Sequence, residues 1–317
     1  MSAGRGAEDP LVVALGGGHG LYASLTALRQ ITSNLTAIVT VADDGGSSGR
    51  LRDELHVPPP GDLRMALSAL CEDTEWGRMW RDVLQHRFVT DGPLDGHALG
   101  NLLIAGLWNR TGDVVEGLDW VARLLRAQGT VLPLAVEPLE INASVVVDGE
   151  VVRVRGQVAV ATAPGRISKL WLRPEEPRVP PQTLAAIRDA DLVALGPGSW
   201  YSSVLPHFLV APVAAELVAA GPRCVLSLNI AHLDDETEGT DRVDDVRALQ
   251  TVAPDFVPAV VIVDEGHADD PGLAALIEDW GSILIVERLL QDGTLDRHDT
   301  ERFAGAYRSA AAILERG

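Results

Sequence analysis

Six short runs of apolar residues constrain the fold of this sequence more than any other feature. They lie at residues 11–17, 35–43, 191–198, 223–230, 259–266 and 282–289. Each run is continuously apolar, as in the strands of a parallel sheet that is covered on both faces. Helix-length segments such as GLYASLTALRQI and APVAAELVAAG lie between the runs. This alternation predicts an α/β fold with a doubly wound, mostly parallel sheet.

Two stretches interrupt the alternation and predict insertions. Residues about 62–130 carry apolar side chains at a spacing near 3.6, which indicates helices. Residues about 134–176 are typical of short strands, with Asp148 and Gly149 as the turn of a β-hairpin. We expect both stretches to be insertions in a single domain that spans residues 1–317.

The composition argues against several classes of partner. The chain has 26 basic and 45 acidic side chains and a formal net charge of −19, which repels nucleic acids and anionic membranes. The first ten residues lack the apolar core of a signal peptide, and no apolar run approaches the roughly 18 residues of a membrane span. The only cysteines, Cys71 and Cys224, indicate neither a disulfide framework nor a CxxC metal site. We expect a cytoplasmic protein without nucleic-acid or membrane partners.

The first apolar run ends in a glycine-rich turn that leads into a helical segment. The turn consists of Gly16, Gly17, Gly18, His19 and Gly20. The backbone amides of such a turn can face a phosphate at the positive end of the helix. The turn meets the dinucleotide fingerprint GxGxxG only in part, because Leu21 stands at the third glycine position. It predicts either a nucleotide or phosphate site or only a tight connection.

The second run ends in an acidic loop, ADDGGSSGR. Its candidate ligand-binding residues are Asp43, Asp44, Gly45, Gly46, Ser47, Ser48 and Arg50. In a doubly wound sheet this loop lies beside the first glycine turn, at the carboxyl edge where ligands bind. Its glycines and serines suit an anionic group, and its acids suit a hydroxyl group or a divalent cation such as Mg²⁺. A solvated Asp-Gly turn is the structural alternative.

An NAD-binding oxidoreductase is a further alternative. Asp43 follows the glycine turn at about the distance at which dinucleotide-binding proteins keep their ribose-binding acid. The sequence contains no identifiable hydride-transfer site.

Two further segments place a glycine-containing turn before an expected helix, the first after a rigid proline turn and the second after an apolar strand. In PPPGDLR, Asp62 either caps a helix or joins Asp43 and Asp44 in a carboxylate cluster that could hold Mg²⁺. The segment GPGSWYSS adds the candidates Gly196, Gly198, Ser199, Tyr201 and Ser202. Its glycines allow close approach and its serines offer hydroxyl groups. Trp200 either packs in the core or stacks on a base.

Six motifs, in this order and spacing, make the chain resemble the gluconeogenesis factor family (YvcK-like), the bacterial relatives of 2-phospho-L-lactate transferase. The motifs are GGGHG, TVADDGGSSGRLR, PPGDLR, GHALGNLL, GPGSWYSSVLP and NI…ETEG, and the resemblance runs from about Val12 to Leu249. The form of GPGSWYSSVLPHFLV resembles that of actinobacterial members. The resemblance implies a Rossmann-like core, a cytoplasmic protein, and binding of UDP-sugars, UDP-N-acetylglucosamine especially. It also implies a role in cell shape and cell-wall synthesis during gluconeogenic growth, but no established reaction.

The resemblance also implies roles for individual residues. Gly16 to Gly20 would form the phosphate loop, residues 43–50 would face the ligand, and GPGSWYSS would form the opposite wall. Asn229 would supply an amide for hydroxyl or base recognition. His97 and Asn101 lie four residues apart, on one face of an expected helix, and either contact the ligand or complete a capped helix start. Three positions depart from the family pattern, namely His19, Met65 and Asp245.

The sequence leaves open whether the chain is an enzyme. The corresponding regions of the transferase relatives bind a guanosine diphosphate conjugate, and their acids are thought to hold a metal. Asp43, Asp44 and Asp62 are therefore the catalytic candidates for a Mg-dependent phospho-lactyl or nucleotidyl transferase. We expect instead a UDP-sugar-binding regulatory factor without demonstrated catalysis. We expect that the chain can form a homodimer and that it acts through a cell-wall regulatory protein.

Overall fold

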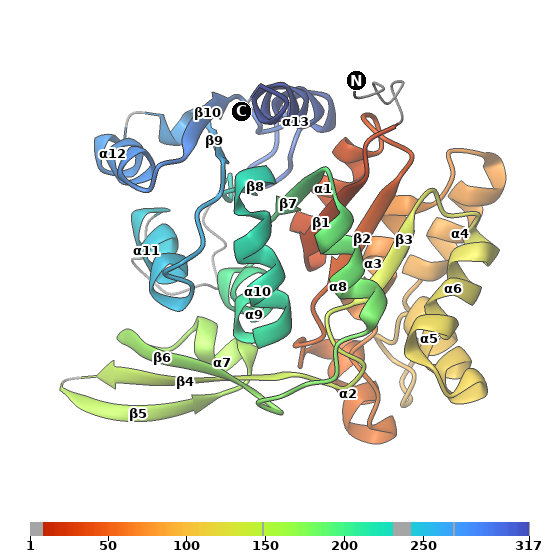
Figure 1. The fold of residues 1–317 in the computed structure, drawn as a ribbon. Coiled ribbons are helices and arrows are strands. Elements are labelled where there is room, and N and C mark those ends of the chain that lie inside the picture. Colours follow the sequence, from red (N-terminus) through yellow and green to blue (C-terminus); the bar gives the residue numbers. More distant parts are fainter. Residues whose placement is uncertain (1–8, 148, 231–241, 269, 317) are drawn as a thin grey trace.

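The computed structural model describes residues 9–316 apart from 148, 231–241 and 269. At its centre is a parallel sheet with the strand order β10-β9-β8-β7-β1-β2-β3 (Figure 1). The strands are β1 (Val12–Gly16), β2 (Leu35–Val39), β3 (Thr130–Pro133), β7 (Leu192–Leu195), β8 (Cys224–Ser227), β9 (Val260–Asp264) and β10 (Ile283–Glu287). The predicted α/β class and doubly wound parallel sheet are confirmed.

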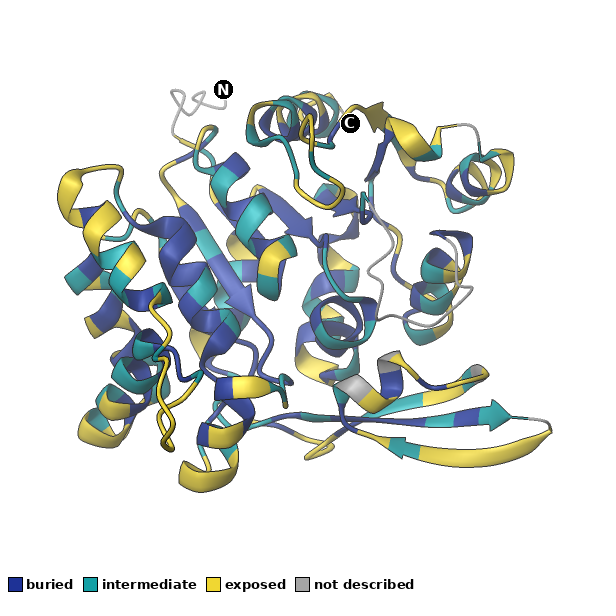
Figure 2. Ribbon diagram, turned by 180° about the vertical axis from the view of Figure 1, so that it is seen from behind, coloured by how far each residue is buried: buried dark blue, intermediate teal, exposed yellow. Residues whose placement is uncertain are grey.

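Strand β3 was missed in the sequence, whereas each of the six apolar runs contains one strand of the sheet. β3 has four residues, ends at Pro133 and pairs only with β2, at the edge of the sheet. A proline cannot donate a hydrogen bond to a further strand, and so short a segment carries little periodic signal. The core strands β1, β7, β8 and β9 are buried at every residue, as their continuous apolar character predicts (Figure 2).

Helices cover both faces of the sheet (Figure 1). On one face, α1 (Gly18–Leu28) packs against α3 (Gly61–Leu70) and α13 (Thr300–Leu314). On the other, α10 (Ala211–Ala220) packs against α8 (Pro181–Asp189) and α9 (Leu205–Leu209). The central strands β1, β7, β8 and β9 thereby lie between two helical layers, whereas β10 at the edge of the sheet is largely exposed. The polar groups at the strand ends are left at the edge of the sheet.

The expected helical stretch contains α3 and three more helices, α4 (Glu75–Gln85), α5 (Leu99–Thr111) and α6 (Val114–Leu125). The other helices are α2 (Gly46–Leu55), α7 (Gln157–Ala161), α11 (Arg242–Val252) and α12 (Pro271–Asp279), with a π-helical turn at Trp200–Val204 and 3₁₀ turns at Gly221–Arg223 and Glu265–His267. Trp200 is buried in the core. No single helix among the described residues is long and apolar enough to cross a membrane, although the bent pair Trp200–Leu209 and Ala211–Arg223 passes the same test of length and composition.

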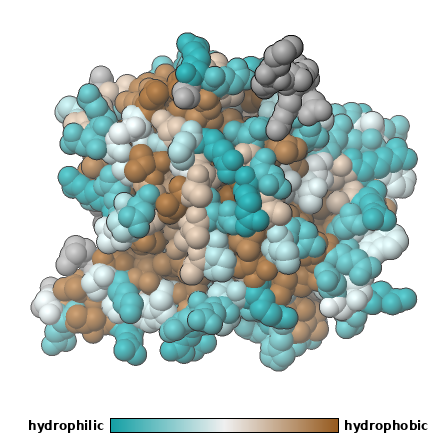
Figure 3. All heavy atoms as spheres, viewed as in Figure 1, coloured by the Kyte–Doolittle hydropathy of each residue, from teal (hydrophilic) through white to brown (hydrophobic). Residues whose placement is uncertain are grey.

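A separate antiparallel sheet in the order β5-β4-β6 extends from the body as an arm (Figure 1). Its strands are β4 (Glu140–Val147), β5 (Glu150–Arg155) and β6 (Arg166–Arg173). Val147 pairs with Glu150, and Gly149 has a φ of 85°, so the hairpin turn lies where it was predicted; Asp148 itself lies outside the described residues. Val151 and Val152 on β5 are exposed, and apolar side chains are interspersed with polar ones over this face of the molecule (Figure 3).

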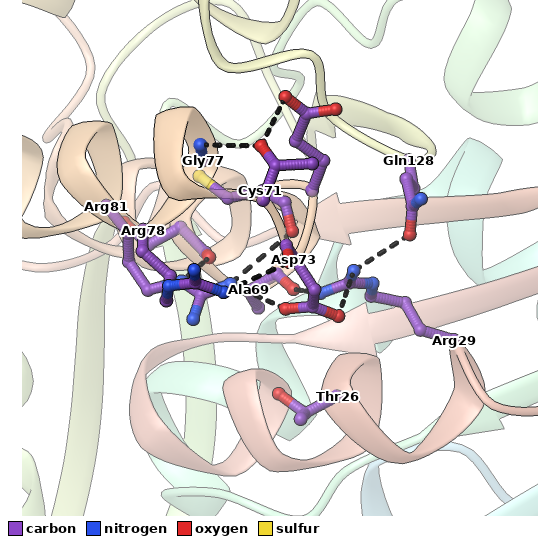
Figure 4. Close-up of polar contacts among 12 residues, drawn as sticks. Thr26, Arg29, Ala69, Cys71, Asp73, Gly77, Arg78, Arg81 and Gln128 are labelled. Atoms are coloured by element: carbon purple, nitrogen blue, oxygen red, sulfur yellow. Dashed lines mark hydrogen bonds and ion pairs between the residues drawn. The ribbon is translucent and has the colours of Figure 1, made fainter.

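Arginine side chains tie the carboxyl end of α3 to its neighbours (Figure 4). The guanidinium group of Arg29, at the end of α1, donates to the Ala69 carbonyl oxygen at 2.8 Å and to the Asp73 carboxylate at 3.1 Å. Arg81 in α4 donates to the Ser68 carbonyl oxygen at 3.2 Å and to Asp73 at 3.3 Å. The last carbonyl groups of a helix lack partners within it, and cations there are also favoured by the helix dipole. These contacts therefore join α1, α3 and α4 at the amino-terminal edge of the sheet.

Removal of Arg29 is expected to destabilise the fold. In Arg29→Ala a buried carbonyl group loses a charge-assisted hydrogen bond, so the free energy of unfolding should fall by about 1.5–3 kcal/mol in urea titrations. The control is Arg123→Ala, since the Arg123 side chain is 66% exposed and its contacts, an ion pair with Asp119 and a position over the Trp120 ring, are made within its own helix. This change should cost at most about 1 kcal/mol. Equal losses in the two variants would contradict the role assigned to Arg29.

Candidate functional site

A cavity of about 290 Å³ opens at the carboxyl edge of the sheet. The chain adds strands from β1 toward β3 in one direction and from β7 toward β10 in the other. The connections after β1 and β7 therefore leave the sheet on opposite sides, and ligands of doubly wound proteins bind at such a switch point. The lining consists of Gly17, Gly18, His19, Gly20, Asp43, Asp62, Gln157, Pro197, Gly198, Ser199, Ser202, Ser203, Asn229, Ile230, Asp296 and His298.

The cavity brings together about half of the predicted site residues. Those that line it are Gly17, Gly18, His19, Gly20, Asp43, Asp62, Gly198, Ser199, Ser202 and Asn229. Those outside its lining are Gly16, Asp44, Gly45, Gly46, Ser47, Ser48, Arg50, His97, Asn101, Gly196 and Tyr201. Ligand contact stays a prediction for the residues of both groups.

Two glycines let the walls of the cavity approach each other. A Cβ atom on Gly17 would lie against the Asp62 carboxylate and 2.9 Å from the Ser203 hydroxyl oxygen. A Cβ atom on Gly20 would overlap the carbonyl oxygen of Pro197. Side chains at these positions would force the walls apart. Glycine is therefore needed at both for close contact, which the incomplete GxGxxG pattern alone did not reveal.

Asp62 lies at the amino end of α1 and is partly exposed to the cavity. Its carboxylate accepts the backbone N–H of Gly18, in the first turn of α1, where amides have no partner within the helix. Burial, and next the charge of Asp43, raise the pKa of Asp62 to about 7. Asp62 is not the cap of its own helix, as one interpretation of the sequence had it, because α3 begins at Gly61 with Pro60 in the capping position. Its carboxylate instead faces the anion-attracting end of α1.

Asp43 and Asp44, although adjacent, have different surroundings. The Asp43 carboxylate accepts hydrogen bonds from the Gly45 amide and the Gln157 side chain, both at 2.9 Å. Burial raises its pKa despite these donors. Asp44 is exposed, and its carboxylate accepts the backbone N–H of Gln157 at 3.0 Å, at the start of α7. Asp44 therefore joins α7 to the loop and does not line the cavity.

The arrangement of the carboxylates limits how a metal could be bound. Within the part of the chain that the structure describes, no three His, Cys, Asp or Glu side chains converge as a metal site. Asp43 and Asp62 do face the same cavity. Mg²⁺ is commonly held by one or two carboxylates together with substrate phosphates and water. The pair fits a Mg²⁺ ion that arrives with a phosphorylated ligand better than a cage of three aspartates.

The loop predicted for residues 43–50 becomes a helix from Gly46 onward. The side chain of Ser47 is buried, and its hydroxyl group contacts His97 Nδ1 at 3.0 Å and accepts the Asn101 side-chain amide at 3.0 Å. Arg50 donates to the Asp95 carbonyl oxygen at 2.7 Å. These side chains fix α2 against α5 and the loop that precedes it. The sequence pattern missed the helix because GSSG has low helix propensity, and contacts between the helices override it.

The expectation that His97 and Asn101 lie on one helical face is wrong. α5 begins at Leu99, with Ala98 in the capping position, so His97 precedes the helix. The two residues nevertheless meet at Ser47. Their contacts join α2 to the start of α5, but no side chain caps this helix, and the buried Asn101 Oδ1 has no hydrogen-bond partner within the described part of the chain. Ligand contact by either residue stays a prediction.

Two hydrogen bonds made by the side-chain amide of Asn229 hold the opposite wall of the cavity. Asn229 Oδ1 accepts the Gly198 N–H at 2.7 Å, and Asn229 Nδ2 donates to the Gly198 carbonyl oxygen at 3.0 Å. Ser199 Oγ accepts the N–H of Ser202 at 3.2 Å. Asn229 thus uses both ends of its amide group on the backbone of the wall. Its predicted contact with a ligand would have to be made in addition to these bonds.

Several lining residues were not anticipated from the sequence. Gln157 begins the short helix α7 in the β-rich insertion, and Asp296 and His298 come from the loop between β10 and α13. His298 stacks on Phe303, with ring centroids 4.8 Å apart, and burial lowers its pKa to about 4. These residues follow no periodic pattern or glycine turn, so only the fold reveals that they share the cavity.

Two of the three departures from the family pattern lie outside the lining. His19 lines the cavity, whereas Met65 is in α3 and Asp245 is in α11. Asp245 accepts a hydrogen bond from Arg242 at 3.0 Å. The ETEG part of the last family motif, residues 236–239, falls outside the described residues.

The chain belongs to the family of 2-phospho-L-lactate transferase CofD, which matches residues 12–281. It is 50% identical over 257 residues to a relative from Mycobacterium tuberculosis (strain ATCC 25618 / H37Rv), covering 80% of this chain and 75% of the relative. It is 40% identical over 269 residues to the gluconeogenesis factor of Bacillus subtilis (strain 168), covering 83% and 81%. The crystal structure of a Bacillus halodurans protein has a TM-score of 0.83 at 33% identity, covering 98% of this chain and 100% of that one. The predicted resemblance to gluconeogenesis factors is confirmed.

The ionisation of Asp62 should make stability depend on pH. Its pKa is raised from 3.8 to about 7 on folding, so the folded protein holds this proton more tightly than the unfolded chain between these values. The contribution of this group therefore favours folding at low pH and is lost as the pH rises through about 7. We expect the free energy of unfolding of Asp62→Asn to increase relative to that of the wild type as the pH rises from 5 to 8. At about 1.4 kcal/mol per pKa unit, this gain is at most a few kcal/mol. Urea titrations at four pH values test this, and a constant difference between the two proteins would contradict it.

Proposed function

We propose that the cavity binds a UDP-sugar, UDP-N-acetylglucosamine in particular, and that the protein acts as a regulatory factor. The observation that carries this proposal is the meeting of the α1 amino terminus, two acidic side chains and a wall of serine hydroxyl groups in one cavity. Amides at a helix amino terminus suit the diphosphate, while carboxylates and hydroxyl groups suit the hydroxyl groups of ribose and sugar. The cavity thus offers groups of suitable chemistry for the diphosphate and for the hydroxyl groups of a nucleotide-sugar.

The charges of Asp43 and Asp62 affect the binding of a diphosphate. An ionised Asp43 and Asp62 would repel phosphate groups at the α1 amino terminus. Protonation of Asp62, whose pKa is about 7, removes one of these charges. A Mg²⁺ ion between carboxylates and phosphates would have the same effect. The proposal therefore includes ligand binding that is assisted by a proton at low pH or by Mg²⁺ at high pH.

The biological role is proposed from the relatives. The Bacillus subtilis relative is named a gluconeogenesis factor. A role of this chain in cell-wall synthesis and cell shape during gluconeogenic growth, in the cytoplasm, rests on that relationship. Expression of this chain in a Bacillus subtilis strain that lacks its own factor tests the role. Restored growth and cell shape on a gluconeogenic carbon source would support it, and failure at normal protein levels would count against it.

A transferase is the second candidate, because the family is named for 2-phospho-L-lactate transferase and Asp43 and Asp62 face one cavity. Positioning and a metal ion supply most of the catalysis of phosphoryl transfer. Incubation with Mg²⁺, a nucleotide-activated donor and candidate acceptors should then give a product that Asp43→Asn abolishes and Asp44→Asn retains. An intact donor after long incubation would remove this candidate.

UDP-N-acetylglucosamine should raise the melting temperature of the protein, whereas UDP, GDP and NAD should do so less or not at all. Ligand at a hundred times its dissociation constant stabilises by about 2.7 kcal/mol, which corresponds to a rise of about 2 °C or more. The panel is run with and without Mg²⁺, and calorimetry measures the affinity of each hit. A shift with GDP or NAD alone would transfer support to the transferase or the oxidoreductase.

A cavity variant should then weaken the binding selectively. Ser202 lines the cavity, so Ser202→Ala should raise the dissociation constant about two- to tenfold if one hydrogen bond to the ligand is lost. Ser168→Ala is the matched control, because Ser168 lies on β6 and donates to the Ser144 carbonyl oxygen. Equal affinity in both variants would place the ligand away from Ser202.

A further inference from the structure

A chain of buried hydroxyl groups connects the carboxyl-terminal helix to the wall of the cavity. Ser227 Oγ contacts Tyr307 Oη at 3.3 Å, Tyr307 Oη contacts Ser24 Oγ at 3.0 Å, and Ser24 Oγ contacts the Gly196 carbonyl oxygen at 2.8 Å. All three side chains are almost fully buried. They come from β8, α13 and α1, and Gly196 follows β7. The chain of contacts therefore joins four elements.

The direction of every hydrogen bond in this chain is determined. The Gly196 carbonyl oxygen can only accept, so the hydroxyl group of Ser24 must donate to it. Each hydroxyl group has one proton to donate. Ser24 must then accept from Tyr307, and Tyr307 must accept from Ser227. Aligned hydrogen bonds of this kind polarise one another, so loss of the middle member affects the bond that Ser24 makes to Gly196.

Gly196 is the first residue of the turn that forms the wall. It has a φ of 71°, and the next two residues, Pro197 and Gly198, line the cavity. The Pro197 carbonyl oxygen lies so close to Gly20 that no Cβ atom fits there. Gly198 is held by the amide group of Asn229. The chain of hydrogen bonds from Ser227 through Tyr307 and Ser24 to Gly196, the hydroxyl relay, fixes the start of the turn, and Asn229 fixes its end.

The ring of Tyr307 reaches the cavity by a second path. It packs against Phe303 with ring centroids 4.6 Å apart, and Phe303 stacks on His298, a lining residue. A phenylalanine at position 307 would supply the same ring contact without a polar group to bury. Burial of a hydroxyl group is costly unless it is hydrogen-bonded. The phenol oxygen therefore has a specific task in the relay to Gly196.

We propose that Tyr307 is a positioning residue that sets the Gly196–Gly198 turn, so that α13 is part of the ligand-binding apparatus. The part of this proposal that concerns affinity rests on the proposed UDP-sugar site. The part that concerns the turn can be measured without any ligand.

The experiment compares the wild type with Tyr307→Phe, Ser24→Ala and the double variant. Ser282→Ala is the matched control, since Ser282 is a buried serine that donates to the Pro258 carbonyl oxygen away from the cavity. Hydrogen-exchange mass spectrometry of the free proteins reports on residues 196–203. We expect faster exchange in that segment in Tyr307→Phe and Ser24→Ala, with unchanged exchange in β4–β6, and no such local effect in the control.

Calorimetry with UDP-N-acetylglucosamine supplies the second measurement. Each single variant should bind about five- to tenfold more weakly, as expected for one lost hydrogen bond of the supporting structure. Because both changes interrupt one relay, the double variant should bind no more weakly than Ser24→Ala alone. Wild-type exchange at residues 196–203 in Tyr307→Phe, or additive losses of affinity, would overturn the proposal. If the wild type does not bind the nucleotide-sugar, the proposed function fails, and the exchange data alone decide the role of Tyr307. If Tyr307→Phe does not fold, Ser24→Ala decides it.

Discussion

The cavity depends on a carboxylate that is held where the fold attracts anions. Asp62 accepts the amide of Gly18 at the amino end of α1, the place where the helix dipole and free amides favour a negative charge. This contact is possible because Gly17 has no side chain to separate the two segments. Asp43 then lies close enough to raise the pKa of Asp62 further. Two acids and a helix terminus thus share one small volume, and its charge depends on whether the two carboxyl groups are protonated.

The position of the cavity follows from the topology of the sheet. Because the chain reverses its direction of strand addition between β1 and β7, the helices that follow these strands diverge and leave a crevice. The two walls that face it come from segments far apart in the sequence, the glycine turn after β1 and the glycine turn after β7. Both turns are held by side chains from other segments. Asp62 holds the first, and Asn229 and the hydroxyl relay hold the second.

The sequence predicts most of the fold because the core strands carry their own signal. A strand that is buried on both faces must be apolar throughout, and β1, β7 and β9 are recognisable for that reason. The edge strand β3 is not, because four residues that end in proline carry no such pattern. The helix that begins at Gly46 was missed because tertiary contacts of Ser47, rather than local propensity, stabilise it.

Most of the predicted lining residues come from segments that follow an apolar strand, whereas Asp62 was predicted from the PPPGDLR turn and Asn229 from the family resemblance. A glycine turn after an apolar strand indicates which backbone reaches the carboxyl edge, and this pattern located Gly17, Gly20 and Gly198. It does not indicate which side chains point into the cavity. Asp43 and Asp44 are neighbours in the sequence, yet one lines the cavity and the other binds the start of α7. Asp296 and His298 reach the cavity from a loop that no motif marks.

The acidity of the whole chain is compatible with the proposed binding of an anionic nucleotide-sugar, because the overall charge and the groups of the cavity act over different distances. The net charge of −19 is spread over the molecule, and at physiological ionic strength exposed charges are screened beyond about 8 Å. Amides in the first turn of α1 act at hydrogen-bond distance, where screening is weak. The overall charge would therefore slow the approach of the proposed anionic ligand, while the few groups that line the cavity would decide its affinity. Among these groups, the charges of Asp43 and Asp62 would oppose a phosphate most directly, so under the proposed function their protonation would change the affinity more than any change to the exposed acids.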